Sequence, residues 1–202
     1  TLDSYAREGV AFDGAYCTSP LCVPSRTSLL TGRWPEAHRV RQNSQPKVAF
    51  YEKDIFGVAR ANGYKTGLAG KNHSYMKPEM HDFWREYSHQ SGWKAPDAPK
   101  EYADYDKWLS ELGLHGVSQK PTPFPLEVQF PYRIVSDAID FIDQFGAENF
   151  ALEVSFPEPH NPIQVPKPYF DMFPPDKIPD RLAGPEALKS KNYRWQWMHG
   201  LE

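Results

Sequence analysis

The clearest hydrophobic pattern lies in residues 132–145, YRIVSDAIDFIDQF, where apolar positions recur every three or four residues. This spacing predicts an amphipathic helix. Its buried stripe would consist of Ile134, Ala138, Phe141, Ile142 and Phe145. The mostly apolar segment that follows, NFALEVSF at 149–156, predicts a strand of the kind buried in a parallel sheet.

A second helix-then-strand unit comes earlier in the chain. Residues 51–64, YEKDIFGVARANGY, predict a helix that ends at Gly63, and residues 64–71, YKTGLAGK, predict a strand. The inward-facing positions of that helix would be Tyr51, Ile55, Val58 and Ala59. Two such units favour the α/β class, a mostly parallel sheet flanked by helices. In open sheets of this class the ligand crevice lies at the carboxyl ends of the strands. Here the two strands would end near Lys71 and Phe156.

The remaining pattern is less regular. We expect a short helix at 1–8 that stops at Gly9, a strand at 10–17, and a helix that starts at Pro24 and ends at Gly32. The prolines cluster at 78–131 and 157–185, which predicts long ordered loops there. Residues 74–131 lack sustained periodicity apart from a possible helix at 101–112.

Composition bounds the classes of function. The 202 residues suit one globular domain, and the formal net charge of −3 gives no basic face for nucleic acid. No apolar run reaches the roughly 18 residues that a membrane span needs. No signal peptide is visible, and the chain opens abruptly, as if earlier residues were missing.

Residues 15–35, AYCTSPLCVPSRTSLLTGRWP, contain both cysteines of the chain, Cys17 and Cys22. A disulfide between them would close so small a loop that it would gain little. A zinc site has only His38 nearby, with no companion ligand at metal spacing. A Cys-x5-Arg phosphatase motif fails because Ser28 occupies the arginine position.

A chemically special Cys22 is better supported. It would lie at a helix start, where unpaired N–H groups and the helix dipole favour negative charge. Arg26, one turn later, would offer a fork of donors to the same oxyanion. Taken alone, however, a cysteine at a helix start is more commonly a small buried side chain.

The segment CVPSRTSLLTGR resembles the sulfatase motif C-x-P-S-R-x-x-x-x-T-G-R. It matches all seven fixed positions, which are Cys22, Pro24, Ser25, Arg26, Thr31, Gly32 and Arg33. The resemblance implies that a separate maturation enzyme oxidises Cys22 to formylglycine, an aldehyde carried as its hydrate. In that family one hydroxyl of the hydrate attacks sulfur, and the other later helps to expel sulfate.

Two further segments resemble the same family. LAGKNH at 68–73 is similar to its G-K-x-H segment, with Asn72 where tryptophan is usual; Lys71 would bind sulfate oxygens and His73 would deprotonate the hydrate. SFPEPHNPIQVP at 155–166 is similar to its P-H-x-P loop, so His160 would assist departure of the alcohol. Without the motif, all three would be expected to be solvated residues. Cys17 is expected to be a buried free thiol, and the unmatched histidines, His81, His89, His115 and His199, to be surface or loop residues.

The resemblance implies an alkaline phosphatase-like fold and one divalent cation, usually calcium. Such a cation wants six or more oxygen ligands. Cys22, as formylglycine, would be one ligand, but no DD or DHG segment is present to supply the others. Residues 1–202 therefore correspond to the N-terminal-to-middle part of a sulfatase catalytic domain, with a Pro- and aromatic-rich insertion at about 74–131. We expect this segment alone to bind the cation weakly and to be inactive.

Three functions stay open from the sequence. The first is a sulfatase that acts on a sulfated sugar, with Trp84, Trp93 and Trp108 available for stacking. The second is a phosphonate monoester or phosphodiester hydrolase of the same superfamily, and the third is a non-catalytic carbohydrate-binding fragment. By resemblance, the location would be periplasmic, secreted or lysosomal.

Overall fold

The protein is an α/β structure built on a small, fully parallel sheet. The computed structural model describes residues 2–44, 53–87, 111–114, 123–160, 165–167, 169–180 and 184–199. Three strands pair in the order β2–β1–β4: β2 is Phe83–Glu86, β1 is Lys65–Gly70 and β4 is Phe150–Ser155. Both neighbours run parallel to β1, which confirms the fold class predicted from the two helix–strand units.

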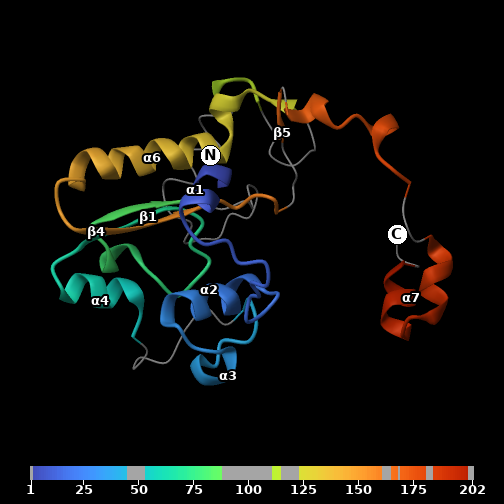
Figure 1. Ribbon diagram of the computed structural model, residues 1–202, viewed down its shortest axis with the longest axis horizontal. Helices are drawn as coiled ribbons and strands as arrows, with labels where there is room; N and C mark the ends of the chain where they lie inside the picture. The colour runs from blue at the N-terminus through green and yellow to red at the C-terminus, as the bar shows by residue number, and fades with distance from the viewer. Residues whose placement is uncertain are drawn as a thin grey trace.

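Helices cover both faces of this sheet (Figure 1). Helix α6 (Phe130–Phe145) packs on one face against β1 and β4. On the other side lie α4 (Ile55–Ala61) and α2 (Cys22–Thr31), with the short α3 (Pro35–His38) beside α2. The arrangement is therefore a three-layer sandwich with β1 at its centre.

The long helix α6 confirms most of its predicted stripe. Ile134, Ala138 and Phe141 are buried, but Ile142 is 48% exposed. Phe141 packs so closely on β1 that a Cβ added at Gly67 would lie 2.7 Å from its ring. The buried residues of α6 also include Phe130 and Asp137, so the buried face is turned away from Ile142 relative to the predicted stripe.

The interior face of α4 differs from the prediction. Phe56 is the buried residue, whereas Ile55 and Val58 are exposed; Tyr51 lies outside the described residues. Asp54 caps the start of the helix, and its carboxylate accepts a hydrogen bond from Gly57 N at 2.7 Å. This start turns Phe56 towards Leu68 and Trp84 in the core.

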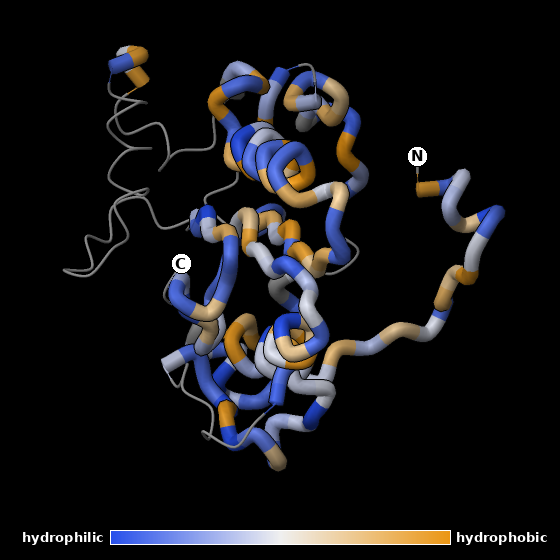
Figure 2. Tube along the Cα trace, turned by 90° about the vertical axis from the view of Figure 1, so that its left-hand side faces the viewer, coloured by the Kyte–Doolittle hydropathy of each residue, from blue (hydrophilic) through white to orange (hydrophobic). Residues whose placement is uncertain are grey.

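The N-terminal segment contains the predicted helix but lacks the predicted strand. Helix α1 covers Leu2–Glu8, and residues 10–17 are exposed and irregular. Figure 2 shows this segment running away from the rest of the molecule, so among the described residues it has no neighbouring strand with which to pair. Cys17 is accordingly exposed, and the prediction of a buried thiol was wrong.

Part of segment 74–131, which was predicted to be a long loop, belongs to the hydrophobic core. Residues 74–131 contain the short helix η1 (Pro78–Met80) and strand β2, and Trp84 on β2 is buried. Trp84 therefore cannot stack on a sugar; Trp93, Trp108, His89, His115 and residues 101–110 lie outside the described part of the chain. Further on lie β3 (Pro123–Phe124) and η3 (Leu126–Val128).

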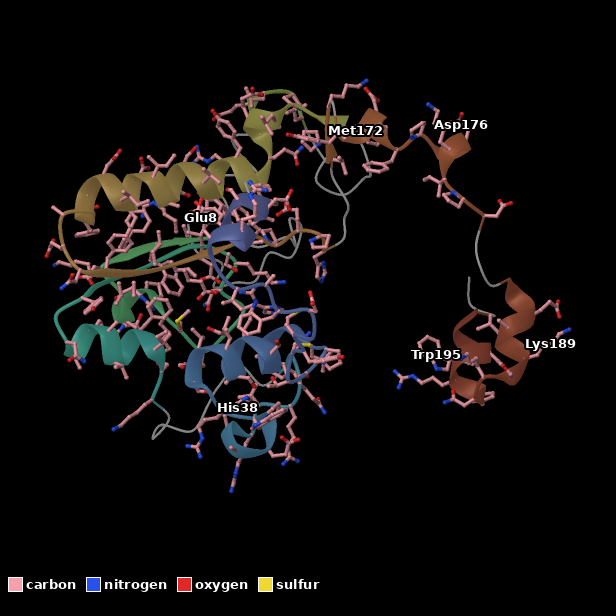
Figure 3. The ribbon with its side chains drawn as sticks, in the orientation of Figure 1. Glu8, His38, Met172, Asp176, Lys189 and Trp195 are labelled. Carbon is pink, nitrogen blue, oxygen red and sulfur yellow. The ribbon has the colours of Figure 1, made fainter. Side chains whose placement is uncertain are left out.

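The C-terminal part consists mainly of short helical turns. Strand β5 (Val165–Pro166) pairs with β3. It is followed by η4 (Tyr169–Met172), η5 (Pro175–Lys177), η6 (Pro185–Ser190) and α7 (Tyr193–His199). Figure 3 marks this path with Met172, Asp176, Lys189 and Trp195. Among the described residues, no helix has the length and apolarity to cross a membrane.

His81 lies in the turn between η1 and β2, in line with the prediction of a surface or loop residue, but its ring is partly buried. Its ring lies between Phe56 and Trp84, with centroids 5.0 and 5.2 Å away. Neither ring nitrogen has a hydrogen-bond partner among the described residues. Burial, with a further contribution from Arg60, lowers the pKa of His81 to about 4, although Asp54 and Asp82 oppose this.

We predict that His81 makes the protein sensitive to acid. Because its pKa is lower in the folded than in the unfolded chain, the unfolded chain takes up the proton first as the pH falls from 6.5 to about 4. Stability is therefore lost across that window. Urea unfolding of His81→Phe should show a shallower decline with pH than the parent protein. Parallel declines in both proteins would contradict the assignment.

Candidate active site

The candidate site lies where β1 and β4 end side by side. Gly70, the last residue of β1, has φ +111°, and a Cβ there would lie 1.9 Å from the carbonyl oxygen of Ser155. Only glycine permits this approach, which lets Lys71 N donate to Ser155 O at 2.7 Å. Lys71 thus leaves the sheet at its carboxyl edge, as predicted for a ligand crevice in this fold class.

Cys22 reaches the same edge from α2. It is the first residue of the helix, and it is a free, partly buried cysteine. The helix start has no side-chain cap from Leu21, but Asn43 Oδ1 accepts from Val23 N at 3.1 Å. The ammonium of Lys71 lies 4.0 Å from Cys22 Sγ. The two residues predicted from separate motifs are therefore in contact.

Arg26 is anchored through a single nitrogen. Its Nη1 donates to Ser155 Oγ at 2.8 Å and to Lys71 O at 2.9 Å, and lies 3.3 Å from Glu153 Oε1. Its Nη2 and Nε make no hydrogen bond to any residue in the described ranges. The guanidinium is thus fixed at one end and keeps a fork of donors for an anion.

Glu153 is the carboxylate behind this arginine. Its side chain is 18% exposed and forms an ion pair with Arg26. Burial raises the pKa of Glu153, while the charge of Arg26 acts in the opposite direction. The second oxygen, Oε2, is buried and has no hydrogen-bond partner among the described residues.

Burial also shifts the pKa values of the two basic residues after β1, Lys71 and His73. It lowers the pKa of Lys71, against the influence of Cys22 and together with that of Arg26. Burial lowers the pKa of His73 as well, and the charges of Lys71, Arg26 and His160 contribute in the same direction. His73 is therefore neutral at pH 7 and able to accept a proton.

The loop that carries Lys71 and His73 is held by Asn72. Its buried side chain donates to Met76 O at 3.0 Å and accepts from Ser74 N at 3.2 Å and Ser74 Oγ at 2.6 Å. Between these residues His73 has φ +45°, a conformation that non-glycine residues rarely adopt. Asn72, at the position where the resembling segment usually has tryptophan, thus fixes this loop through hydrogen bonds.

His160 belongs to the loop after β4. Its N–H donates to Pro157 O at 3.1 Å, and the residue is exposed. Its charge influences the pKa of His73, so the loops after β1 and β4 bring the two histidines into one electrostatic environment. The five residues predicted from the sequence, Cys22, Arg26, Lys71, His73 and His160, thus gather at one edge of the sheet.

His38, which was considered as a metal ligand, is a structural residue. It is buried beside α2 (Figure 3), and its Nε2 lies 2.9 Å from Ser28 Oγ. Its Nδ1 accepts from Val40 N at 3.1 Å, so Nε2 carries the proton and donates to the serine. These bonds fix α3 against α2 and thereby support the helix that starts with Cys22.

Three residues of the site were missed by sequence reasoning, namely Asn43, Glu153 and Ser155. The signal available for Glu153 was a charged residue inside an otherwise apolar strand. Asn43 and Ser155 carried no comparable signal, because their partners are distant in sequence.

A calcium site does not follow from these residues. Within the described ranges, no group of three or more histidine, cysteine, aspartate or glutamate side chains is placed to hold a metal ion. The acidic residue nearest to Arg26, Glu153, is engaged with that arginine. We therefore assign no chemical step to a metal.

Comparison with solved structures identifies the class of the fold. The chain aligns with phosphonate monoester hydrolase of Agrobacterium radiobacter at a TM-score of 0.69 and 23% identity, covering 97% of this chain and 43% of that one. The phosphonate monoester hydrolase of Silicibacter pomeroyi gives a TM-score of 0.71 at 18% identity, covering 93% and 42%. The chain therefore shares the fold of these two hydrolases.

Within that class, the chain belongs to the sulfatase family, whose model matches residues 1–193. It is 30% identical to an arylsulfatase of Clostridium perfringens, over 93% of this chain and 44% of that protein. It is 28% identical to a choline-sulfatase of Rhizobium meliloti, over 85% and 35% respectively. The chain spans less than half the length of these relatives.

The Asn72 network predicts a measurable cost when it is removed. Asn72→Ala leaves the buried carbonyl of Met76 and the amide of Ser74 without partners, and should destabilise the protein by about 2 kcal/mol. Asn62→Ala is the matched control, because its bond to Val58 O is exposed and should be worth about 0.5 kcal/mol or less. Equal losses in urea unfolding of the two variants would contradict a special role for Asn72.

Proposed function

We propose that the protein hydrolyses sulfate esters at the edge formed by β1 and β4, with a formylglycine derived from Cys22. One observation carries the proposal. The side chain of Cys22 lies 4.0 Å from the ammonium of Lys71, while Arg26, anchored to the same strands, keeps two of its nitrogens for an anion. Membership of the sulfatase family supports this chemistry.

Arg26 and Lys71 would bind the sulfate group. The Nη2 and Nε donors of Arg26 form a planar fork that suits two oxygens of a tetrahedral anion. Lys71 adds a positive charge next to the nucleophile. Because the Arg26 guanidinium is held by Lys71 O and Ser155 Oγ, it needs little reorganisation as charge develops on the oxygens.

Cys22 has the surroundings that a formylglycine needs. It is partly accessible, it stands at a helix start, and it has no disulfide partner. When formed, a formylglycine hydrate supplies a hydroxyl that bonds to sulfur and a second hydroxyl whose deprotonation allows sulfate to leave.

The two histidines would move the protons. His160, in the exposed loop after β4, would donate a proton to the ester oxygen as the alcohol leaves. His73, which is neutral at pH 7, would accept the proton that is lost when sulfate departs. One water is consumed overall, and one alcohol, one sulfate and one proton are formed.

The identity of the ester stays a prediction. A sulfated sugar was expected from the three tryptophans, but Trp84 is buried, and the other two lie outside the described residues. Aryl sulfate and aryl phosphonate with the same leaving group would separate the sulfatase proposal from the phosphonate alternative, and a strong preference for the phosphonate would overturn it.

Cys22 offers the direct test of this proposal. In the active protein, mass spectrometry of the peptide with Cys22 should show the mass of an aldehyde at that position in place of the mass of the thiol. Cys22→Ala should lower kcat by about a thousandfold or more, because the nucleophile is lost.

Cys17→Ala is the control, since Cys17 is exposed on the N-terminal segment, and it should retain activity. An active protein in which Cys22 is still a thiol would refute the proposed mechanism.

A further inference from the structure

Glu153 brings a negative charge into a site that is otherwise built for anions. It projects from β4 towards Arg26 and is only 18% exposed. None of the motifs includes it, and the proposed reaction gives it no proton to carry. A carboxylate in such a place is costly, because burial disfavours its charged form.

Glu153 is not needed to direct Arg26. The nitrogen Nη1 carries two hydrogens, and the two shorter bonds, to Ser155 Oγ at 2.8 Å and Lys71 O at 2.9 Å, suffice to use them. The approach of Glu153 Oε1 is longer, at 3.3 Å, and Oε2 has no partner among the described residues. Lys71 O and Ser155 Oγ are neutral acceptors, so the distinct contribution of Glu153 is its negative charge.

The negative charge of Glu153 affects how strongly the site binds monoanions relative to dianions. Lys71 and Arg26 contribute two positive charges, and Glu153 cancels one of them. Repulsion from a fixed negative charge is twice as large for a dianion as for a monoanion at the same position. A sulfate ester carries one negative charge, whereas a phosphate monoester, with a second pKa near 6, carries nearly two above pH 7.

We propose that Glu153 is a specificity-determining residue that makes the site favour esters with a single negative charge over phosphate monoesters with two. The inference rests on the proposed function, since it concerns the anion bound by Arg26 and Lys71. It changes no bond-making step. It discriminates through repulsion of the wrong substrate and not through a new contact with the right one.

The test compares 4-nitrophenyl sulfate with 4-nitrophenyl phosphate, which share a leaving group, at about pH 8 in the full-length protein. Glu153→Gln keeps the shape and removes the charge. It should raise the ratio of kcat/KM for phosphate over sulfate about tenfold. Glu153→Met, which also removes the charge, should raise the ratio in the same direction and covers the case in which the glutamine variant folds poorly.

Two control variants separate charge from position. Glu153→Asp retains the charge and should keep the parent ratio. Ser155→Ala loosens Arg26 without a change of charge, so it should lower both activities by similar factors. An unchanged ratio in the active Glu153→Gln and Glu153→Met variants would overturn the inference, as would equal losses on both substrates.

A binding measurement keeps the inference distinct from the proposed function. Calorimetric titration with inorganic phosphate at about pH 8 needs no turnover, and Glu153→Gln should bind phosphate about tenfold more tightly than the parent protein. Tighter binding would support the charge role of Glu153 even if sulfate hydrolysis were absent. Unchanged affinity would contradict it even in an active sulfatase.

Discussion

The candidate site depends on the attachment of Arg26 to the ends of two parallel strands. One nitrogen of this guanidinium bonds to the carbonyl of Lys71 after β1 and to the hydroxyl of Ser155 at the end of β4. The strands can hold it because Gly70 lets β1 and β4 converge closely at that point. Helix α2, which carries Arg26, is tied to the sheet by the same bonds, and Cys22 is thereby placed next to Lys71.

The supporting residues follow from this arrangement. His38 and Ser28 fix α3 against α2, Asn43 caps the first turn of α2, and Asn72 holds the loop after β1. Each of these contacts is made by a side chain that touches no reacting group in the proposed reaction. The site is therefore a set of loop and helix-end residues whose positions are set by a second layer of polar contacts.

The sequence predicted the parts of the fold that have strong periodicity. Helix α6, strands β1 and β4 and the end of α2 at Gly32 were all predicted, because their local patterns agree with their packing. Strand β2 was missed because its four residues lie in a segment rich in proline and aromatic residues. The predicted strand at 10–17 is wrong because an alternating pattern forms a strand only beside a partner.

The site residues likewise divide into those that the sequence predicts and those that only the folded structure shows. Cys22, Arg26, Lys71, His73 and His160 were found from motifs, whereas the contacts of Glu153 and Ser155 with Arg26 become visible only when β4 is placed beside β1.

In the proposed reaction Arg26 keeps its anchored nitrogen on the strands while Nη2 and Nε bind sulfate together with Lys71. A crystal structure of Cys22→Ala with a bound aryl sulfate tests it most directly. We expect sulfate oxygens within hydrogen-bond distance of Nη2, Nε and Lys71 Nζ, with Nη1 still bonded to Ser155. Sulfate bound away from this edge, or Nη1 released from Ser155, would contradict this binding mode.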